Sequence, residues 1–159
     1  MRWWSRIRRY ATGVRGTTTS EGIAKRRLAA DDALMETTTD IATTIDRYLA
    51  TWNEPDGRIR AEQARAVWAR DGRLVDPLID AVGPDAIAAA IGDLRDQMPG
   101  HSLTRTTVID AHHDQARFGW TVNAPDGSVA VAGIDAVTFT ADGRIQTATG
   151  FFGDMEVAA

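Results

Sequence analysis

The segment SVAVAGIDAVTFT, residues 128–140, decides the fold class because its residues alternate in character with a period of two. The odd-numbered residues form a mostly apolar row: Val129, Val131, Gly133, Asp135, Val137 and Phe139. The other parity carries mainly alanine and threonine. Successive side chains of a β-strand point to opposite faces of its sheet. The alternation therefore predicts a strand that buries one face.

Similar alternation continues on both sides of this strand. It predicts three more strands, at residues 102–111, 116–124 and 144–152. The connecting turns are short and polar: His112-His113-Asp114-Gln115, Pro125-Asp126-Gly127 and Ala141-Asp142-Gly143. Consecutive strands joined by short turns pair as antiparallel hairpins. We therefore predict a four-stranded antiparallel meander from residue 102 onward.

Before residue 101 the apolar residues recur at helical spacing, which predicts three helices. The first presents one apolar face: Ile41, Ile45, Tyr48, Leu49 and Trp52. The second, with Trp68 on its inner side, ends at Asp71-Gly72, and a short strand follows at 73–76. The third lies between Gly83-Pro84 and Pro99-Gly100. Helices followed by a meander predict an α+β domain in which the helices cover one face of a curved antiparallel sheet.

The length and composition fit one ordinary globular domain, since the chain has 159 residues, of which 43% are hydrophobic and 25% are charged. There is no cysteine, which excludes disulfides and thiolate metal sites and predicts a reducing, cytoplasmic location. No apolar run is long enough to span a bilayer, so we expect no integral membrane segment.

Charge divides the chain at about Leu34. Residues 1–34 carry a net charge of +5, whereas the remaining residues carry −9. So acidic a domain is a poor match for phosphate backbones, and we expect no nucleic-acid partner. The arginines and tryptophans of residues 2–9 fit a basic amphipathic surface helix. We favour a disordered extension, or a segment upstream of a functional start at Met35, with the folded domain at 35–159.

Three ionisable side chains interrupt the apolar faces. Asp135 lies in the buried row of its strand, where an ionised carboxylate is costly unless it is paired, hydrogen-bonded or protonated. Tyr48 lies on the apolar face of the first helix. Asp76 shares strand parity with Leu74 and precedes Pro77, which ends sheet pairing there. Taken singly, Tyr48 fits a packed core residue and Asp76 fits a turn residue. Taken together, the three groups predict one functional pocket.

Four segments resemble, in order and spacing, those of the nuclear transport factor 2-like superfamily, which includes SnoaL-like polyketide cyclases and ketosteroid isomerases. These segments are Arg47-Tyr48-Leu49, Val75-Asp76-Pro77, Gly133-Ile134-Asp135 and Phe151-Phe152-Gly153. The resemblance covers nearly all of residues 40–154. It implies a cone-shaped sheet that encloses an apolar pocket, and a homodimer.

The resemblance also implies a role for each ionisable residue. Asp76 would be the general base, and Tyr48 would donate a hydrogen bond to a developing oxyanion. Asp135 would be a protonated acid that donates the second hydrogen bond, a division known from ketosteroid isomerases. An apolar lining would keep Asp135 neutral and bind the substrate: Phe118, Trp120, Val131, Val137 and Phe152.

The leading interpretation is therefore an enzyme that transfers a proton α to a carbonyl on an apolar polycyclic substrate, with no cofactor. The alternative is a non-catalytic module of the same fold that binds a hydrophobic ligand or dimerises. Asp110, His112, His113 and Asp114 have the composition of metal ligands. Their place in a tight turn favours a solvated hairpin, and we predict no metal site.

Overall fold

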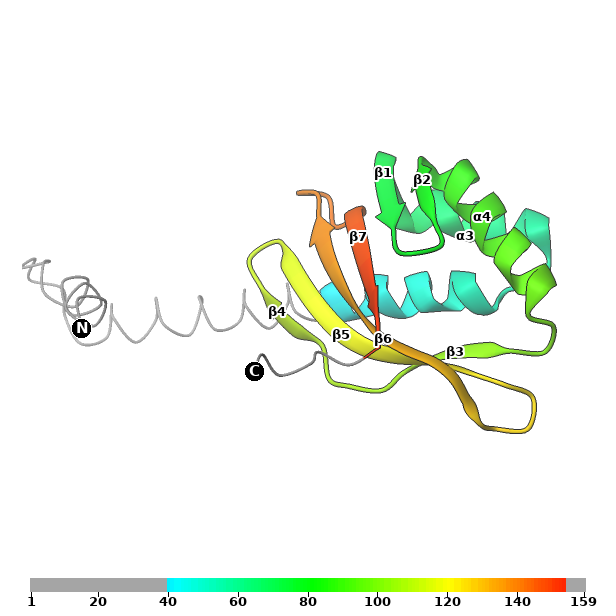
Figure 1. Ribbon diagram of the computed structural model, residues 1–159. Coiled ribbons are helices and arrows are strands. Elements are labelled where there is room, and N and C mark those ends of the chain that lie inside the picture. The colour runs from blue at the N-terminus through cyan, green and yellow to red at the C-terminus, as the bar shows by residue number, and fades with distance from the viewer. Residues whose placement is uncertain (1–39, 154–159) are drawn as a thin grey trace, which may run out of the picture. The chain divides into compact units, whose positions relative to one another are not determined.

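The computed structural model describes residues 40–153. The extension predicted over residues 1–34 lies outside this range, so its boundary stays a prediction. The first described helix occupies residues 40–53. Two more helices follow, α3 (Gly57–Val67) and α4 (Pro84–Gln97). Figure 1 shows these helices together with the long curved strands of a single sheet. Within residues 40–153 no helix has both the length and the apolar character needed to cross a bilayer.

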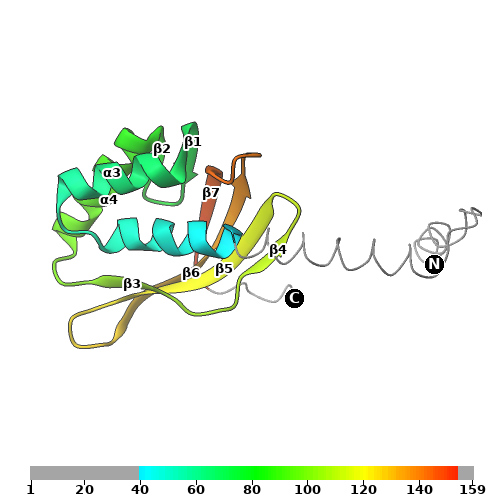
Figure 2. The same cartoon turned by 180° about the vertical axis from the view of Figure 1, so that it is seen from behind.

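Within residues 40–153 the sheet contains seven strands, which follow one another along the chain in this order: β1 (Trp68–Val75), β2 (Asp80–Val82), β3 (Ser102–Arg105), β4 (Asp110–His112), β5 (Gln115–Asn123), β6 (Val129–Phe139) and β7 (Ile145–Phe152). Their spatial order is β2-β1-β7-β6-β5-β3, and β4 also pairs with β5. The predicted meander is confirmed, because β5 pairs with β6 and β6 with β7 in antiparallel fashion. Figure 2 shows the curvature of these strands from behind.

The sheet is mixed rather than wholly antiparallel, because β1 runs parallel to β7. The predicted second helix also ends too late, since α3 stops at Val67 and Trp68 already pairs with Ile145 of β7. Trp68 is fully buried in the strand that continues the chain. Helical spacing in the sequence cannot reveal this pairing, because the partner strand lies more than seventy residues away.

The predicted strand at 102–111 is two strands, β3 and β4. Between them the chain is anchored to Gly119 of β5, whose carbonyl accepts a hydrogen bond from Thr106 N at 2.8 Å. The Thr107 hydroxyl accepts another from Gly119 N, also at 2.8 Å. A Cβ at Gly119 would lie 2.9 Å from the Thr107 methyl carbon. The close contact of Thr106 and Thr107 with β5 therefore requires glycine at position 119. This contact interrupts the edge strand and divides it into β3 and β4.

Local signals explain where the helices begin. Asp56 caps α3, because its Oδ1 accepts hydrogen bonds from the amides of Arg58 and Ile59 at 2.8 and 3.0 Å. Helix α4 begins with Pro84 after Gly83, which has a φ of 85°. The helices and sheet enclose a core whose largest fully buried side chains include Ile45, Tyr48, Trp68, Leu74, Ile87, Ile91, Val137 and Ile145.

Candidate functional site

The fold brings Tyr48, Asp76 and Asp135 together at one cavity. Asp135 lies in the middle of β6, opposite Gly150 of β7. Asp76 directly follows Val75, which pairs with the neighbouring residue of β7, Thr149. A Cβ at Gly150 would lie 3.0 Å from the Asp76 Cβ and 3.2 Å from Asp135 Oδ1. The missing side chain at Gly150 thus lets the two carboxylates approach each other across β7.

Asp135 is buried, with 5% of its surface exposed, and both of its carboxyl oxygens accept hydrogen bonds. The Tyr48 hydroxyl donates to Oδ2 at 2.9 Å, and the Trp120 indole N–H donates to Oδ1 at 2.8 Å. Burial raises the pKa of the Asp135 carboxyl above its ordinary value, and the two hydrogen bonds offset part of that rise. The negative charge of Asp76 adds to the rise.

Tyr48 is held by aromatic neighbours on three sides. Its ring meets those of Trp52, Trp68 and Phe118 edge to face, at centroid distances of 6.2, 5.7 and 6.4 Å. Burial raises the pKa of the Tyr48 hydroxyl well above its ordinary value, and the neighbouring Asp135 raises it further. The hydroxyl is therefore a neutral hydrogen-bond donor at neutral pH. Its position is fixed by ring packing and does not depend on a flexible side chain.

Asp76 is held by the turn that it begins. Its Oδ1 accepts hydrogen bonds from the backbone amides of Leu78 and Ile79, at 2.7 and 2.8 Å. Its own amide donates to the Ile79 carbonyl at 2.8 Å. Such a turn is a common structural role for aspartate before proline. Oδ2 makes no hydrogen bond within residues 40–153, so one oxygen of this half-buried carboxylate is left for other chemistry.

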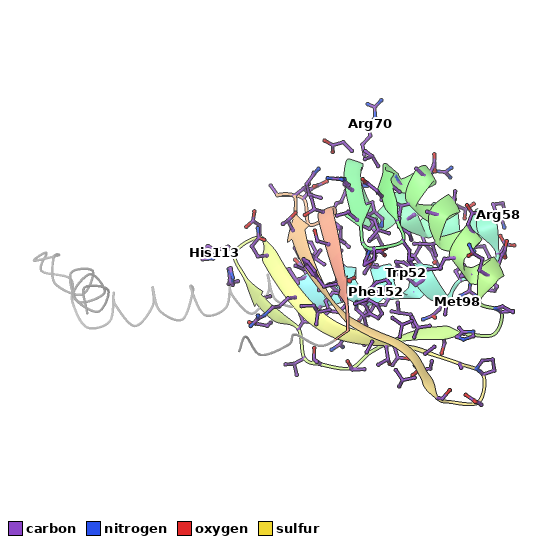
Figure 3. The ribbon with its side chains drawn as sticks, in the orientation of Figure 1. Trp52, Arg58, Arg70, Met98, His113 and Phe152 are labelled. Atoms are coloured by element: carbon purple, nitrogen blue, oxygen red, sulfur yellow. The ribbon has the colours of Figure 1, made fainter. Side chains whose placement is uncertain are left out.

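The cavity is mostly apolar. It is lined by Tyr48, Trp52, Asp76, Leu78, Leu94, Met98, Leu103, Trp120, Val122, Val131, Asp135 and Phe152. The space that a water molecule can enter is about 40 Å³. Figure 3 shows Trp52 and Phe152 between the helices and the sheet, with Met98 at the end of α4. Within residues 40–153 the buried indole nitrogen of Trp52 has no hydrogen-bond partner.

Three of the residues predicted to bind substrate line this cavity, namely Trp120, Val131 and Phe152. The other two, Phe118 and Val137, do not line it, since they are buried in the core with 2% and 1% of their surface exposed. They point to the same face of the sheet as the lining residues, but they belong to the buried core, where Phe118 packs against the ring of Tyr48. Trp120 was predicted only as an apolar neighbour, and its hydrogen bond to Asp135 gives it a polar role as well.

Several lining residues were missed by sequence reasoning. Trp52 lies one helical turn after Tyr48, and that spacing was a usable signal. Leu78 follows Asp76 in an irregular turn, where no periodic pattern predicts that its side chain points inward.

At the other end of the sheet, His112 and His113 lie exposed at the β4–β5 turn, and His113 has a φ of 54°. Within residues 40–153 no group of three histidine or acidic side chains is arranged to hold a metal ion.

Residues 45–148 match the family model of the SnoaL-like domain. The chain belongs to the SnoaL-like family. A structure similar to this SnoaL-like protein is that of a candidate isomerase of the same family from Agrobacterium tumefaciens strain C58. The two are 35% identical, the match covers 73% of this chain and 99% of the other, and the TM-score is 0.70.

A candidate SnoaL-like polyketide cyclase from Jannaschia sp. CCS1 shares the fold at 16% identity, with a TM-score of 0.59 and coverage of 72% and 85%. A de novo designed protein with a curved β-sheet also shares it, at 10% identity and a TM-score of 0.57, with coverage of 72% and 86%. A comparison with curated proteins finds no significant match. The superfamily and the fold predicted from the sequence are thereby confirmed.

Proposed function

We propose that this SnoaL-like protein is an enzyme that transfers a proton at the carbon α to a carbonyl without a cofactor, as an isomerase or cyclase of an apolar polycyclic ketone. The observation that carries the proposal is the meeting of Asp76 with the Tyr48–Asp135 pair at one apolar cavity. Such chemistry needs a positioned base and a donor for the oxygen that becomes negative.

Asp76 is the base in this mechanism. Its carboxylate removes the α-proton, and the electrons of the C–H bond move into the carbonyl to form an enolate. The protonated Asp76 then returns the proton to another carbon of the conjugated system. In a cyclase the enolate carbon instead attacks a second carbonyl of the substrate, and Asp76 gives its proton to the alkoxide that forms. The backbone amides of Leu78 and Ile79 support this role, because they hold one carboxyl oxygen while leaving the other free.

The Tyr48–Asp135 pair stabilises the enolate oxygen if Asp135 is neutral. A neutral Asp135 and Tyr48 carry one O–H each. One of these makes the 2.9 Å hydrogen bond that joins the pair, and the other can donate to the substrate oxygen. If Asp135 is ionised, it accepts a hydrogen bond from the Tyr48 O–H, and no O–H remains for the substrate. The raised pKa of Asp135 favours the neutral form and therefore supports this assignment.

A polycyclic substrate requires the cavity to open. Ligand pockets usually enclose roughly 300–1,000 Å³, whereas a water molecule can enter only about 40 Å³ of this cavity. Leu78 lines the cavity and has 64% of its surface exposed, so it lies at the mouth. Rotation of the Leu78 side chain would widen the entrance while its backbone amide stays hydrogen-bonded to Asp76.

Exchange of α-protons with D₂O, followed by NMR, tests the proposal without knowledge of the natural product. The probes are a β,γ-unsaturated steroid ketone and an aromatic polyketide intermediate. We expect the wild type to catalyse exchange and Asp76→Asn to lose it. Asp71→Asn, which changes an exposed carboxylate of β1 outside the cavity, is the control and should behave as wild type. Exchange at the uncatalysed rate with both substrates would contradict the proposal.

A non-catalytic module that binds a hydrophobic ligand is the second candidate. It is favoured by the fact that Tyr48, Trp120 and Asp135 already satisfy one another's hydrogen bonds without a ligand. This candidate predicts that the same ketones bind, that no exchange occurs, and that Asp76→Asn leaves their affinity unchanged.

We also propose that the protein is a cytoplasmic homodimer. Ile134 and Phe151 support a dimer, because they are cross-strand neighbours on β6 and β7 with 38% and 55% of their surfaces exposed. The absence of cysteine supports a reducing compartment. Sedimentation of the wild type beside Phe151→Lys tests the dimer, which the added charge should dissociate.

A further inference from the structure

A second cavity lies beside the candidate site. It is lined by Trp52, Ile91, Leu94, Arg95, Met98, His101, Ser102, Leu103 and Val122. A water molecule can enter about 40 Å³ of it, as in the first cavity. Five side chains line both cavities: Trp52, Leu94, Met98, Leu103 and Val122. The two spaces are thus neighbours that share one apolar wall.

This shared wall lies near the surface of the domain. All five of its side chains are only partly buried, unlike the core residues beneath them. Met98 caps the C-terminal end of α4 and has an unbranched side chain, which adapts to different shapes at low cost. Figure 3 shows Met98 at that end of the helix, beyond Trp52. Rotation of Met98 and its leucine neighbours would join the cavities into one elongated channel that leads away from Asp135.

Arg95 gives the far end of this channel its charge. It is the only lysine or arginine among the side chains that line the two cavities. Its Nη1 donates to the Trp52 carbonyl at 2.7 Å, which fixes the guanidinium beside the shared wall. Among residues 40–153, six other arginines form ion pairs with carboxylates, but Arg95 forms none. Its remaining N–H groups are therefore available to an anionic ligand.

The other polar groups at this end do not cancel that charge. His101 Nδ1 lies 3.2 Å from the Pro99 carbonyl oxygen, and the electrostatic interaction of His101 with Asp126 helps to lower the pKa of that carboxyl. Ser102 adds an uncharged hydroxyl. Neither carboxylate of the candidate site, Asp76 or Asp135, lines this second cavity.

We infer that the substrate is an elongated apolar ketone with a carboxylate or similar anionic group at the end remote from the reacting carbonyl. Its ring system would lie across the shared wall, and Arg95 would bind its anionic group. The placement of the carbonyl beside Tyr48 and Asp135 rests on the proposed function, whereas the anion site rests on Arg95 alone. Arg95 is thus a specificity-determining residue and takes no part in proton transfer.

Two fluorescent probes of similar shape test this inference. Anilinonaphthalene sulfonate is anionic, and phenylnaphthylamine is its neutral counterpart. We expect the wild type to bind the anionic probe more tightly. Arg95→Gln should lower the affinity for the anionic probe about tenfold or more, since a hydrogen bond to a charged group is lost. It should leave the neutral probe unchanged. Arg95→Lys should retain most of the preference for the anionic probe over the neutral one. Arg58→Gln, on the exposed face of α3, is the control and should retain the whole preference.

Val131→Trp tests whether the cavities join. Val131 lines only the first cavity. If the channel is continuous, the larger side chain should weaken the binding of both probes, although residue 131 does not line the cavity that contains Arg95. Equal losses of both probes in Arg95→Gln, or equal affinities of both probes for the wild type, would overturn the anion site. Anionic-probe binding that is unaffected by Val131→Trp would overturn the channel. Because these are binding measurements, they stay interpretable if proton exchange is not observed.

Discussion

Trp120 donates its indole N–H to Oδ1 of Asp135 at 2.8 Å, although both residues lie on a face of the sheet that otherwise carries apolar side chains. The two residues come from neighbouring strands, where Trp120 pairs with Gly133 and Phe118 pairs with Asp135. Trp120 can reach across because Gly133 has no side chain: a Cβ there would lie 2.6 Å from the indole ring. The hydrogen bond stabilises the ionised form of Asp135 and so opposes the effect of burial.

Replacement of Trp120 by phenylalanine should therefore raise the pKa of Asp135 further. The ring volume is nearly kept, while the donor that favours the carboxylate is lost. If the neutral form of Asp135 is the active one, the proton-exchange rate falls at high pH as Asp135 ionises. In Trp120→Phe this fall should occur at a higher pH than in the wild type. A pH–rate profile of both proteins measures the shift. A high-pH limb that is unmoved or moves downward would exclude Asp135 as the titrating group.

The stability of the wild type should also depend on Asp135. Its pKa in the folded protein is raised above the ordinary value of 3.8, so the folded state holds a proton that the unfolded chain has lost. The free energy of unfolding therefore falls as pH rises from about 4 through the raised pKa, with a limiting slope of about 1.4 kcal/mol per pH unit. Below that interval the contribution of Asp135 is fully present.

Urea denaturation of wild type and Asp135→Asn across this range isolates the effect. Exposed carboxylates such as Asp56 and Asp126 have lowered pKa values and contribute with the opposite sign, but they are common to both proteins. The stability of Asp135→Asn relative to wild type should rise with pH. A difference that stays constant with pH would show that Asp135 does not retain its proton on folding.

Asparagine and leucine at position 135 should have very different effects. The Asn amide can donate to the Tyr48 oxygen and its carbonyl can accept from Trp120, so Asp135→Asn resembles the protonated acid. Leucine leaves both buried donors without an acceptor, at a cost of about 1–3 kcal/mol for each. We expect near-normal stability and reduced but measurable exchange for asparagine, and a lowered melting temperature with little exchange for leucine. Thermal melts and exchange assays check both.

Asparagine at position 76 should separate structure from chemistry. Its carbonyl can accept the same two backbone amides, of Leu78 and Ile79, so the turn is kept. The base is lost, and positioned general bases contribute about 10²–10⁴-fold to a rate. Asp76→Ala should instead lose stability as well, by about 1 kcal/mol, because the turn amides lose their acceptor. Comparison of melting temperatures and exchange rates for the two variants checks this, and equal rates for wild type and Asp76→Asn would contradict it.

Gly150→Ala should disturb the site although both acids are kept. The added Cβ would lie 3.0 Å from the Asp76 Cβ and 3.2 Å from Asp135 Oδ1, so the carboxylates must move apart. Overpacking of this kind costs about 1–3 kcal/mol of stability. We expect slower exchange as well as a lower melting temperature. Gly57→Ala, at the exposed start of α3, is the matched control and should change neither.

The strands of the meander were predictable from sequence because their signals are local. Alternation fixes each strand, and a turn with a left-handed glycine, such as Gly127 or Gly143, ends it. The observed bounds of β5, β6 and β7 lie within about a residue of the prediction. The parallel pairing of β1 with β7 has no local signal. The spacing of Ala64, Val67 and Trp68 even favoured a longer helix, and only the distant partner strand overrides it.

The meeting of Tyr48, Asp76 and Asp135 at one cavity was predictable to a similar degree, while their catalytic roles stay predictions. Asp135 was found because a carboxylate in an apolar row conflicts with its surroundings, and Tyr48 because its hydroxyl lies on an apolar helix face. The hydrogen bond from Trp120 was not predictable, since it crosses between strands and depends on Gly133. Leu78 and Arg95 were missed for a different reason. Each lies beside the cavity only because of how a turn or a helix end packs, which no periodic pattern records.

The central place of β7 in the sheet has a consequence for synthesis on the ribosome. This strand lies between β1 and β6, so it links the strand that ends at Val75, directly before Asp76, to the strand that carries Asp135. It is also the last strand of the described chain to emerge. Until then β1 and β6 each present an unpaired edge, and such edges invite association with other chains. The domain therefore lacks an assembled site until β7 has been made, and pairing of β7 with β1 and β6 brings the two carboxylates together in one step.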